Sequence, residues 1–112
     1  MKVIIAGSRG IKHLAAVTQA IEESEFDVTE VVSGCASGVD QLGEQWAELH
    51  KVHCTFMPAD WSRGKHAGLL RNEKMADYAD ALIAVWDGQS KGTQHMINTA
   101  YEKGLAVFVF QP

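Results

Sequence analysis

The chain has 112 residues, of which 46% are hydrophobic, so it is long enough to form one domain with its own core. Ten basic residues against fourteen acidic ones give a formal net charge of −4. That balance weighs against a protein that binds nucleic acid nonspecifically through a broad basic face. No apolar run is long enough to span a bilayer, and the N-terminal residues lack the pattern of a secretory signal.

Apolar runs alternate with helical patterns along the chain. The runs that predict strands lie at residues 2–6, 30–33, 53–57, 81–86 and 106–110. Apolar side chains at helical spacing predict helices over about 11–24, from about 38, after about 65 and from about 92. Leu69 falls on the apolar face of the third helix and Tyr101 on that of the fourth, which Gly104 ends.

The strand runs are continuously apolar, as in parallel sheets that helices cover on both faces. Right-handed crossovers between successive parallel strands then predict a Rossmann-like α/β sandwich with a five-stranded, mainly parallel sheet. We expect residues 1–112 to form a single domain, because neither a linker nor a repeat interrupts them. In such sheets, ligands bind at the carboxyl ends of the strands where the strand order reverses.

The stretch SGCASGVD, Ser33–Asp40, reads as a strand-to-helix turn on that edge. Gly34 and Gly38 lack Cβ atoms, which lets the backbone bend sharply and approach a ligand closely. The helix that begins near Gly38 leaves its first N–H groups unpaired and adds positive potential there. We therefore expect a phosphate site in which Ala36, Ser37 and Gly38 are donors.

Two side chains of this turn have more than one interpretation. Asp40 lies in the first turn of the helix. It either interacts favourably with the helix dipole, as acidic residues in this position often do, or accepts hydrogen bonds from ribose hydroxyls. Cys35 is either a small packing residue, the interpretation we favour, or a thiol activated by the helix end.

The turn after the first strand, GSRG, offers a second anion contact. Gly7 allows close approach, Ser8 can donate to a phosphate oxygen, and Arg9 presents a planar, permanently charged fork. The spacing is not G-x-G-x-x-G, so the sequence does not predict a routine NAD-dependent oxidoreductase.

The turn DGQSKGT after the fourth strand repeats this pattern. Gly92 and Thr93 open a helix, and Ser90 and Thr93 supply hydroxyl groups. Asp87 directly follows the strand, and it is either a working carboxylate or a turn former before Gly88.

The loop PADWSRGKHAG and the residues that follow add side chains near the same edge. Trp61 either stacks on a nucleobase or caps the core, whereas a core role is favoured for Trp46. Arg71 and Asn72 begin a helix there, which suggests a further phosphate contact.

Metal and disulfide patterns are absent from the sequence. Cys35 and Cys54 have neither metal-site nor disulfide-framework spacing, and His50 and His53 lack a third ligand. We expect no metal and no cofactor, and a cytoplasmic protein with reduced thiols and no membrane association.

Together these motifs carry a family resemblance. GSR, SGCASGVD, PADW, AGLLRN and the final GT occur in an order that resembles the YspA-like branch of the SLOG superfamily, nearly from end to end. SGCASGVD is similar to a signature of DprA (Smf) proteins. RNEKMADYADALIAVWDGQSKGT resembles a region of LONELY GUY phosphoribohydrolases, which cleave the N-glycosidic bond of nucleoside monophosphates. Members of the superfamily are inferred to sense or process nucleotide-derived ligands, including NAD- and ADP-ribose-like molecules.

The departures from those hydrolases bear on activity. Arg71 matches their catalytic arginine, but Met96 stands where they have the catalytic glutamate, and a thioether cannot transfer a proton. The resemblance therefore favours binding of a nucleotide-derived ligand, as a sensor or sequestering module, and implies a homodimer or higher homo-oligomer. The rival hypothesis is an N-glycosidase in which Asp87 or Asp40 replaces the glutamate and Arg71 orients the phosphate. Binding of single-stranded DNA is a third hypothesis, which the acidic balance disfavours.

Overall fold

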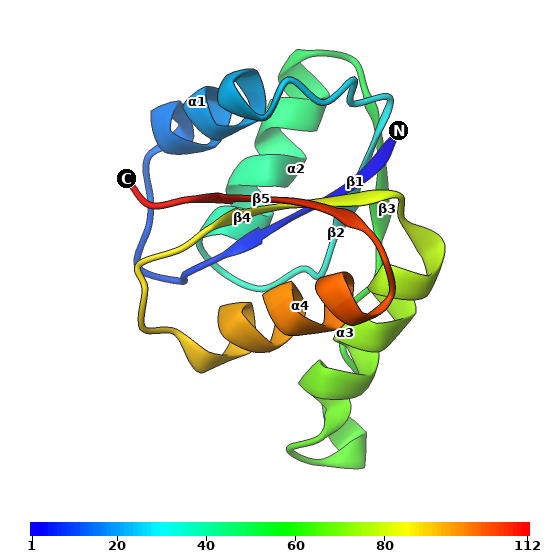
Figure 1. The fold of residues 1–112 in the computed structure, drawn as a ribbon. Coiled ribbons are helices and arrows are strands. Elements are labelled where there is room, and N and C mark those ends of the chain that lie inside the picture. Colours follow the sequence, from blue (N-terminus) through cyan, green and yellow to red (C-terminus); the bar gives the residue numbers. More distant parts are fainter.

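The structure is a computed structural model that describes residues 1–112. Strands and helices alternate from end to end, with one 3₁₀ helix, η1, before the third α-helix (Figure 1). In chain order the elements are β1 Lys2–Gly7, α1 Leu14–Ser24, β2 Glu30–Ser33, α2 Val39–Leu49, β3 His53–Phe56, η1 Trp61–Arg63, α3 Ala67–Tyr78, β4 Ala81–Val85, α4 Lys91–Glu102 and β5 Ala106–Phe110. None of the helices has the length and apolarity needed to cross a membrane.

All five strands are parallel and form one sheet in the order β3-β2-β1-β4-β5. The chain therefore builds outward from β1 through β2 to β3, then returns to the other side of β1 for β4 and β5. This reversal places the topological switch point between β1 and β4, whose carboxyl ends diverge into separate loops. The predicted Rossmann-like α/β sandwich with a five-stranded parallel sheet is confirmed.

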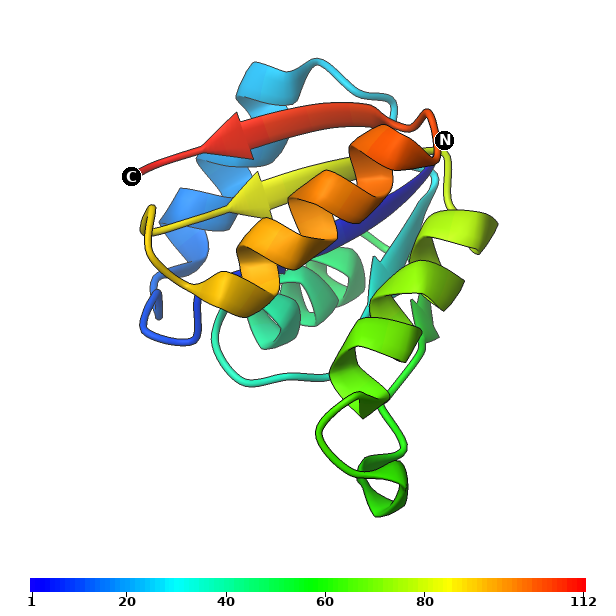
Figure 2. The same cartoon turned by 60° about the horizontal axis from the view of Figure 1, so that its bottom comes forward.

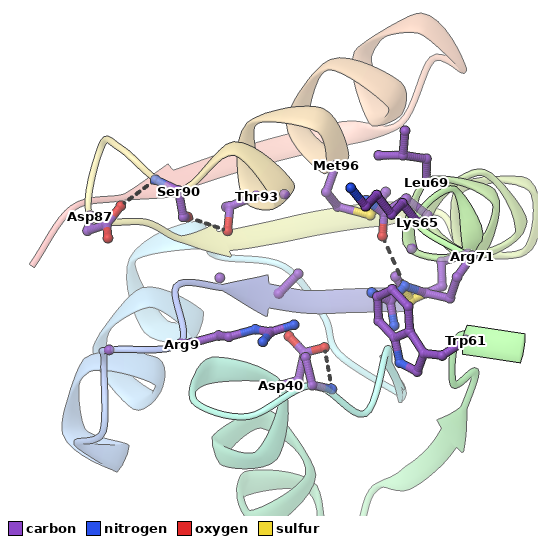
Figure 3. A pocket seen from close by; sticks show the side chains of 18 residues that line it. Arg9, Asp40, Trp61, Lys65, Leu69, Arg71, Asp87, Ser90, Thr93 and Met96 are labelled. Carbon is purple, nitrogen blue, oxygen red and sulfur yellow. Dashed lines mark hydrogen bonds between the residues drawn. The ribbon is translucent and has the colours of Figure 1, made fainter. Parts of the chain in front are cut away.

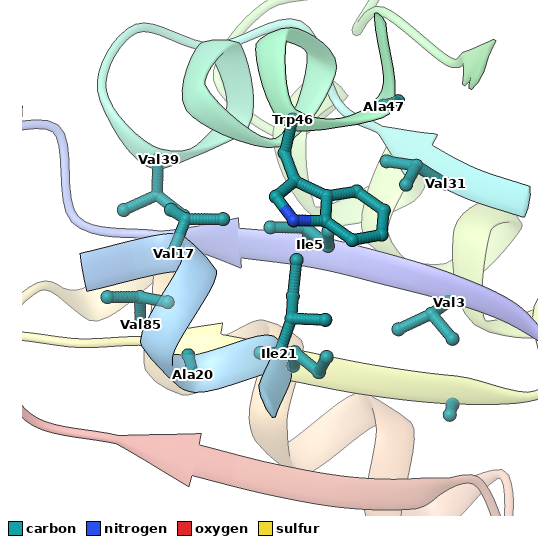
Figure 4. Close-up of a cluster of buried hydrophobic side chains, with 12 residues drawn as sticks. Val3, Ile5, Val17, Ala20, Ile21, Val31, Val39, Trp46, Ala47 and Val85 are labelled. Atoms are coloured by element: carbon teal, nitrogen blue, oxygen red, sulfur yellow. The ribbon is translucent and has the colours of Figure 1, made fainter. Parts of the chain in front are cut away.

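Helices cover both faces of the sheet, α1 and α2 on one and α3 and α4 on the other (Figures 1 and 2). Each face has its own apolar cluster because side chains alternate along a strand. Val3 and Ile5 of β1 point toward α1 and α2, whereas Ile4 points toward α3 and α4. Trp46 packs in the first cluster, as predicted (Figure 4).

Two expectations about helix faces are wrong. Tyr101 is 61% exposed. It lies four residues after Ile97, which is already at the margin of the buried face, and a step of four residues goes about 40° beyond one full helical turn. Tyr101 therefore points away from the sheet. Leu69 is 41% exposed, although it follows the spacing of the buried Asn72 and Ala76. The first turn of α3 projects beyond the sheet together with η1, so nothing covers Leu69 there (Figure 2).

The contact between α2 and β1 predicts a sharp response to added volume at Gly43. A Cβ atom there would lie 2.9 Å from Cβ and Cγ2 of the fully buried Ile5, a β-branched side chain with little freedom to move. Gly43→Ala should therefore lower the free energy of unfolding by about 1–3 kcal/mol, measured by urea titration. Gly92→Ala is the control in another helix. A Cβ atom at Gly92 has no other atom within 4 Å, so this substitution should not lower the free energy of unfolding. Equal effects of the two substitutions would contradict this packing.

Candidate functional site

A pocket of about 520 Å³ opens at the carboxyl edge of the sheet, beside the switch point (Figure 3). Its walls come from the loops after β1, β2 and β4 and from the first turns of α2, α3 and α4. The sequence-predicted residues that line it are Gly7, Arg9, Ala36, Asp40, Trp61, Arg71, Asn72, Asp87, Ser90, Gly92 and Thr93. Residues as far apart in the chain as Ala6 and Met96 thus meet in one cavity.

Two predicted residues lie behind the pocket wall and do not line it. Ser8 is only 2% exposed, and its hydroxyl accepts a 3.0 Å hydrogen bond from the Asp87 N–H and contacts the Ser90 hydroxyl at 3.0 Å. It joins the loops after β1 and β4. Gly34 is buried beneath Arg71, where it leaves room for the guanidinium group.

Three other predicted residues also lie outside the main pocket. Ser37 and Gly38 border a neighbouring hollow of about 330 Å³, which shares Arg9 with the pocket. Gly88 has φ +85° in the loop after β4, and a Cβ atom there would lie 2.6 Å from the Gln111 side-chain nitrogen. Gly88 therefore shapes the loop and does not contribute to the cavity surface.

The turn between β2 and α2 has the close packing that its glycines suggest. Gly38 has φ +79°, and a Cβ atom there would lie 2.6 Å from the Arg9 backbone. It is the N-cap of α2 and offers no side-chain acceptor, so the first N–H groups of the helix lack a side-chain cap. The first turn of α2 therefore presents free donors and positive potential.

Asp40 is a buried carboxyl group in the pocket wall, only 5% exposed. Its Oδ2 atom accepts a 3.2 Å hydrogen bond from the Ala36 N–H. Burial raises the pKa of Asp40 to about 6, while the Ala36 hydrogen bond and the charges of Arg71 and Arg9 oppose that rise. Neither arginine forms an ion pair with Asp40, although the Arg9 side chain points toward it (Figure 3).

Arg71 is held at the opposite wall by two hydrogen bonds. Its Nη1 group donates to the Gly34 carbonyl, and its Nε group donates to Asn72 Oδ1 at 3.0 Å. A Cβ atom on Gly34 would lie 2.6 Å from Arg71 Nη1, so only glycine admits this arrangement. A guanidinium group has five N–H donors, so most of those on Arg71 remain available to a ligand.

Asp87 shapes the loop between β4 and α4. Its Oδ1 atom accepts hydrogen bonds of 2.8 Å from the N–H groups of Gln89 and Ser90, and these bonds lower the pKa of Asp87. The Ser90 hydroxyl donates in turn to Thr93 Oγ1 at 2.9 Å, as Figure 3 shows. Asp87 is thus a turn former at the rim of the pocket, and its second oxygen is free for a ligand.

Trp61 is 59% exposed on η1, and its indole lies against the Gly68 backbone at the outer end of the pocket. It does not cap the core. Lys65 also lines the pocket and adds a third cation.

The prediction missed several lining residues, of which Gly68, Met75 and Met96 have a helical signal. Gly68 and Met75 are three and four residues from Arg71, and Met96 is three residues from Thr93. Such spacing puts side chains on one helix face, so these residues follow from the site residues that were predicted. Ala6, Gly10 and Leu69 complete the missed set, whereas Lys65 belongs to the loop that was expected near this edge.

The cysteines are both free thiols. Cys35 is exposed at φ +64°, so the expectation that it is a small packing residue is wrong. Partial burial of the sulfur atom raises the pKa of Cys35, and partial burial raises that of Cys54 to about 11. Neither thiol is activated by its surroundings. No group of three or more His, Cys, Asp or Glu side chains is arranged to hold a metal ion.

Comparisons with known proteins agree with this architecture. A family model described as "YspA, cpYpsA-related SLOG family" matches residues 1–64. No curated protein matches the sequence. Among solved structures, the chain is similar to the X-ray structure of DNA processing protein A (DprA) from Streptococcus pneumoniae, with a TM-score of 0.76 and 22% identity. The similarity covers 99% of this chain and 50% of that DprA chain, so this chain spans half its length.

The raised pKa of Asp40 predicts a pH-dependent stability. Because the pKa is about 6 in the folded protein against an ordinary 3.8, protonation favours the folded state. This contribution is complete below pH 3.8 and is lost as the pH rises through about 6. Asp40→Asn should therefore match the parent near pH 4 and exceed it by up to about 3 kcal/mol at pH 7, measured by urea unfolding. Asp87→Asn, whose pKa shift has the opposite sign, should show no gain. If the free energies of unfolding of Asp40→Asn and the parent differed by the same amount at every pH, the raised pKa of Asp40 would be contradicted.

Proposed function

The chain belongs to the YspA- and cpYpsA-related SLOG family, and from this premise we propose that it binds a nucleotide-derived ligand in the pocket at the carboxyl edge of the sheet. The ligand class is a nucleoside phosphate, ADP-ribose or an NAD-like molecule, and the protein acts as a sensor or sequestering module. The observation that carries the proposal is what converges on one cavity: two arginines, the N-terminus of α4, and Ala36 and Asp40 from either side of the α2 N-cap, with no side-chain cap on either helix.

A phosphate group has matching donors in this pocket. The N-caps of α2 and α4, Gly38 and Ser90, accept no side-chain hydrogen bond from the backbone N–H groups of their own helices, so N–H groups in both first turns are free for oxygen atoms of the ligand. Arg9 and Arg71 add full positive charges from either side. Charge-assisted hydrogen bonds of this kind are about twice as strong as neutral ones.

The remainder of a nucleotide fits the outer part of the same pocket. The free oxygen of Asp87 and the carboxyl group of Asp40 can accept hydrogen bonds from ribose hydroxyls. The exposed indole of Trp61 offers a flat apolar surface on which a base can stack. The volume of about 520 Å³ lies within the usual range for small-molecule sites.

Binding without hydrolysis is favoured by the side chains that face the cavity. Met96 lines it and is 1% exposed, so a thioether occupies the position at which the resembling hydrolases have an acid. The lowered pKa of Asp87 keeps that carboxylate ionised at neutral pH, which is unsuitable for a general acid.

Calorimetric titration with AMP, ADP-ribose, NAD and cyclic ADP-ribose tests the proposal. We expect saturable binding of at least one ligand, which is recovered intact. Arg71→Ala should weaken that binding by roughly 10- to 100-fold, since it removes charge-assisted hydrogen bonds. Arg63→Ala is the matched control, because Arg63 lies on η1 outside this pocket, and it should leave the affinity unchanged. Absence of binding by all four ligands would refute the proposal.

One observation favours a second candidate, hydrolysis of an N-glycosidic bond. Asp40 has a pKa of about 6 and lines the pocket near Arg71, so a fraction of the protein holds a protonated carboxyl group near neutral pH. If the protein is such a hydrolase, the parent releases free base and ribose phosphate, and Asp40→Asn binds the nucleotide but releases neither. Asp87→Asn should keep most of the turnover. An intact nucleotide after prolonged incubation with the parent rules this candidate out.

Binding of single-stranded DNA is a third candidate, which the similarity to a DNA processing protein suggests but the net charge of −4 disfavours. We expect no binding of oligonucleotides at low or at moderate salt concentration. Oligonucleotide binding that weakens steeply with added salt would support this candidate.

A further inference from the structure

The placement of Arg71 depends on residues beyond the pocket surface. Asn72 follows it on α3 and is buried, with its amide oxygen 3.0 Å from Arg71 Nε. The amide nitrogen of Asn72 lies 3.1 Å from Nδ1 of His95, on the adjacent helix α4. A chain of hydrogen bonds therefore runs from α4 through Asn72 to the Arg71 guanidinium and ends at the Gly34 carbonyl.

The directions of these hydrogen bonds follow from the chemistry of the groups. An arginine Nε group can only donate, so the Asn72 atom that faces it must be the amide oxygen. The amide nitrogen then faces His95 and can only donate. His95 Nδ1 must therefore accept, which requires a neutral imidazole with its proton on Nε2. The direction of each hydrogen bond thus determines the direction of the next.

The Asn72 contact is not a consequence of helix geometry. Neighbouring residues on a helix point about 100° apart and do not normally face one another. The long Arg71 side chain reaches the oxygen of the buried Asn72 amide, and the nitrogen of the same amide contacts His95. The contact and the Gly34 carbonyl together fix the plane of the guanidinium group.

We propose that His95 is a positioning residue, which acts through Asn72 to hold Arg71 ready for an anionic ligand. The consequence for binding rests on the proposed function, whereas the hydrogen-bond chain exists without any ligand. A side chain at position 95 that cannot accept a hydrogen bond frees the Asn72 amide to rotate, and Arg71 then loses one of its two anchors. The affinity falls because the ligand must order a mobile arginine.

The arginine Nε–Hε signals in ¹⁵N-resolved NMR spectra test this chain directly. In the parent, the Arg71 signal, identified by its loss in Arg71→Lys, should exchange slowly with water. His95→Leu should move it to the position and fast exchange of an exposed arginine such as Arg63. His95→Asn carries an acceptor oxygen at the same distance from the backbone as Nδ1, so it should retain the parent signal. An unchanged Arg71 signal in His95→Leu would overturn the proposal.

Titration of the same proteins with AMP then tests the effect on binding. His95→Leu should weaken binding roughly 3- to 30-fold, and His95→Asn should restore it. In an Arg71→Ala background, His95→Leu should have no further effect, because the residue acts only through Arg71. Additive losses would mean that His95 supports the pocket in some other way and would refute the proposal. If the parent binds no AMP, the proposed function fails for that ligand and the NMR result still decides the role of His95.

Discussion

The hydrogen bond from Arg71 to the Gly34 carbonyl joins the two halves of the site. Arg71 belongs to α3, on one face of the sheet, and Gly34 belongs to the turn that leads to α2 on the other face. The hydrogen bonds of Ser8 join the loops after β1 and β4, and the Arg71 contact adds the connection between α3 and the turn after β2. The contact requires glycine at position 34, since a Cβ atom there would collide with both the guanidinium group and the Asp40 carboxyl group. The glycine in the turn and the position of the Arg71 side chain therefore depend on each other.

The charges of the pocket are arranged around this contact. Asp40 is the buried acid on the α2 side, and the positive charges of Arg71 and Arg9 partly offset the effect of its burial. It is not neutralised by either in a close ion pair. The arginines therefore keep capacity to bind an anion, even though the chain as a whole is acidic. Local geometry, and not net charge, is thus the basis of the phosphate site that we propose.

Much of the fold follows from local sequence. The strands are short apolar runs bounded by glycine and polar turns, so the doubly covered sheet could be predicted, whereas the strand order that places the switch point between β1 and β4 was not. The three loops at the carboxyl edge also follow from that topology, because parallel strands end on the same side. Tyr101 shows where periodicity fails, since the width of the buried face depends on how closely α4 packs on the sheet.

The remaining parts of the site depend on contacts between distant segments. Ser8 carries a hydroxyl at the right edge, but whether it faces a ligand or a neighbouring loop depends on the course of residues 87–90, which local patterns do not determine. The same holds for His95, whose partner Asn72 lies on another helix. Asp87 had two interpretations, and the hydrogen bonds from Gln89 and Ser90 establish its role in the turn.

The most direct test of the account is an NMR titration of the backbone amides with AMP. We expect saturable shifts concentrated in residues 34–40 and 90–93, because residues of both turns that lead into α2 and α4 line the pocket. We also expect small changes along β3, whose far edge lies outside the pocket. Saturable shifts confined to other surfaces, or amides of both turns unmoved at millimolar AMP, would contradict the claim that these helix ends hold a nucleotide phosphate.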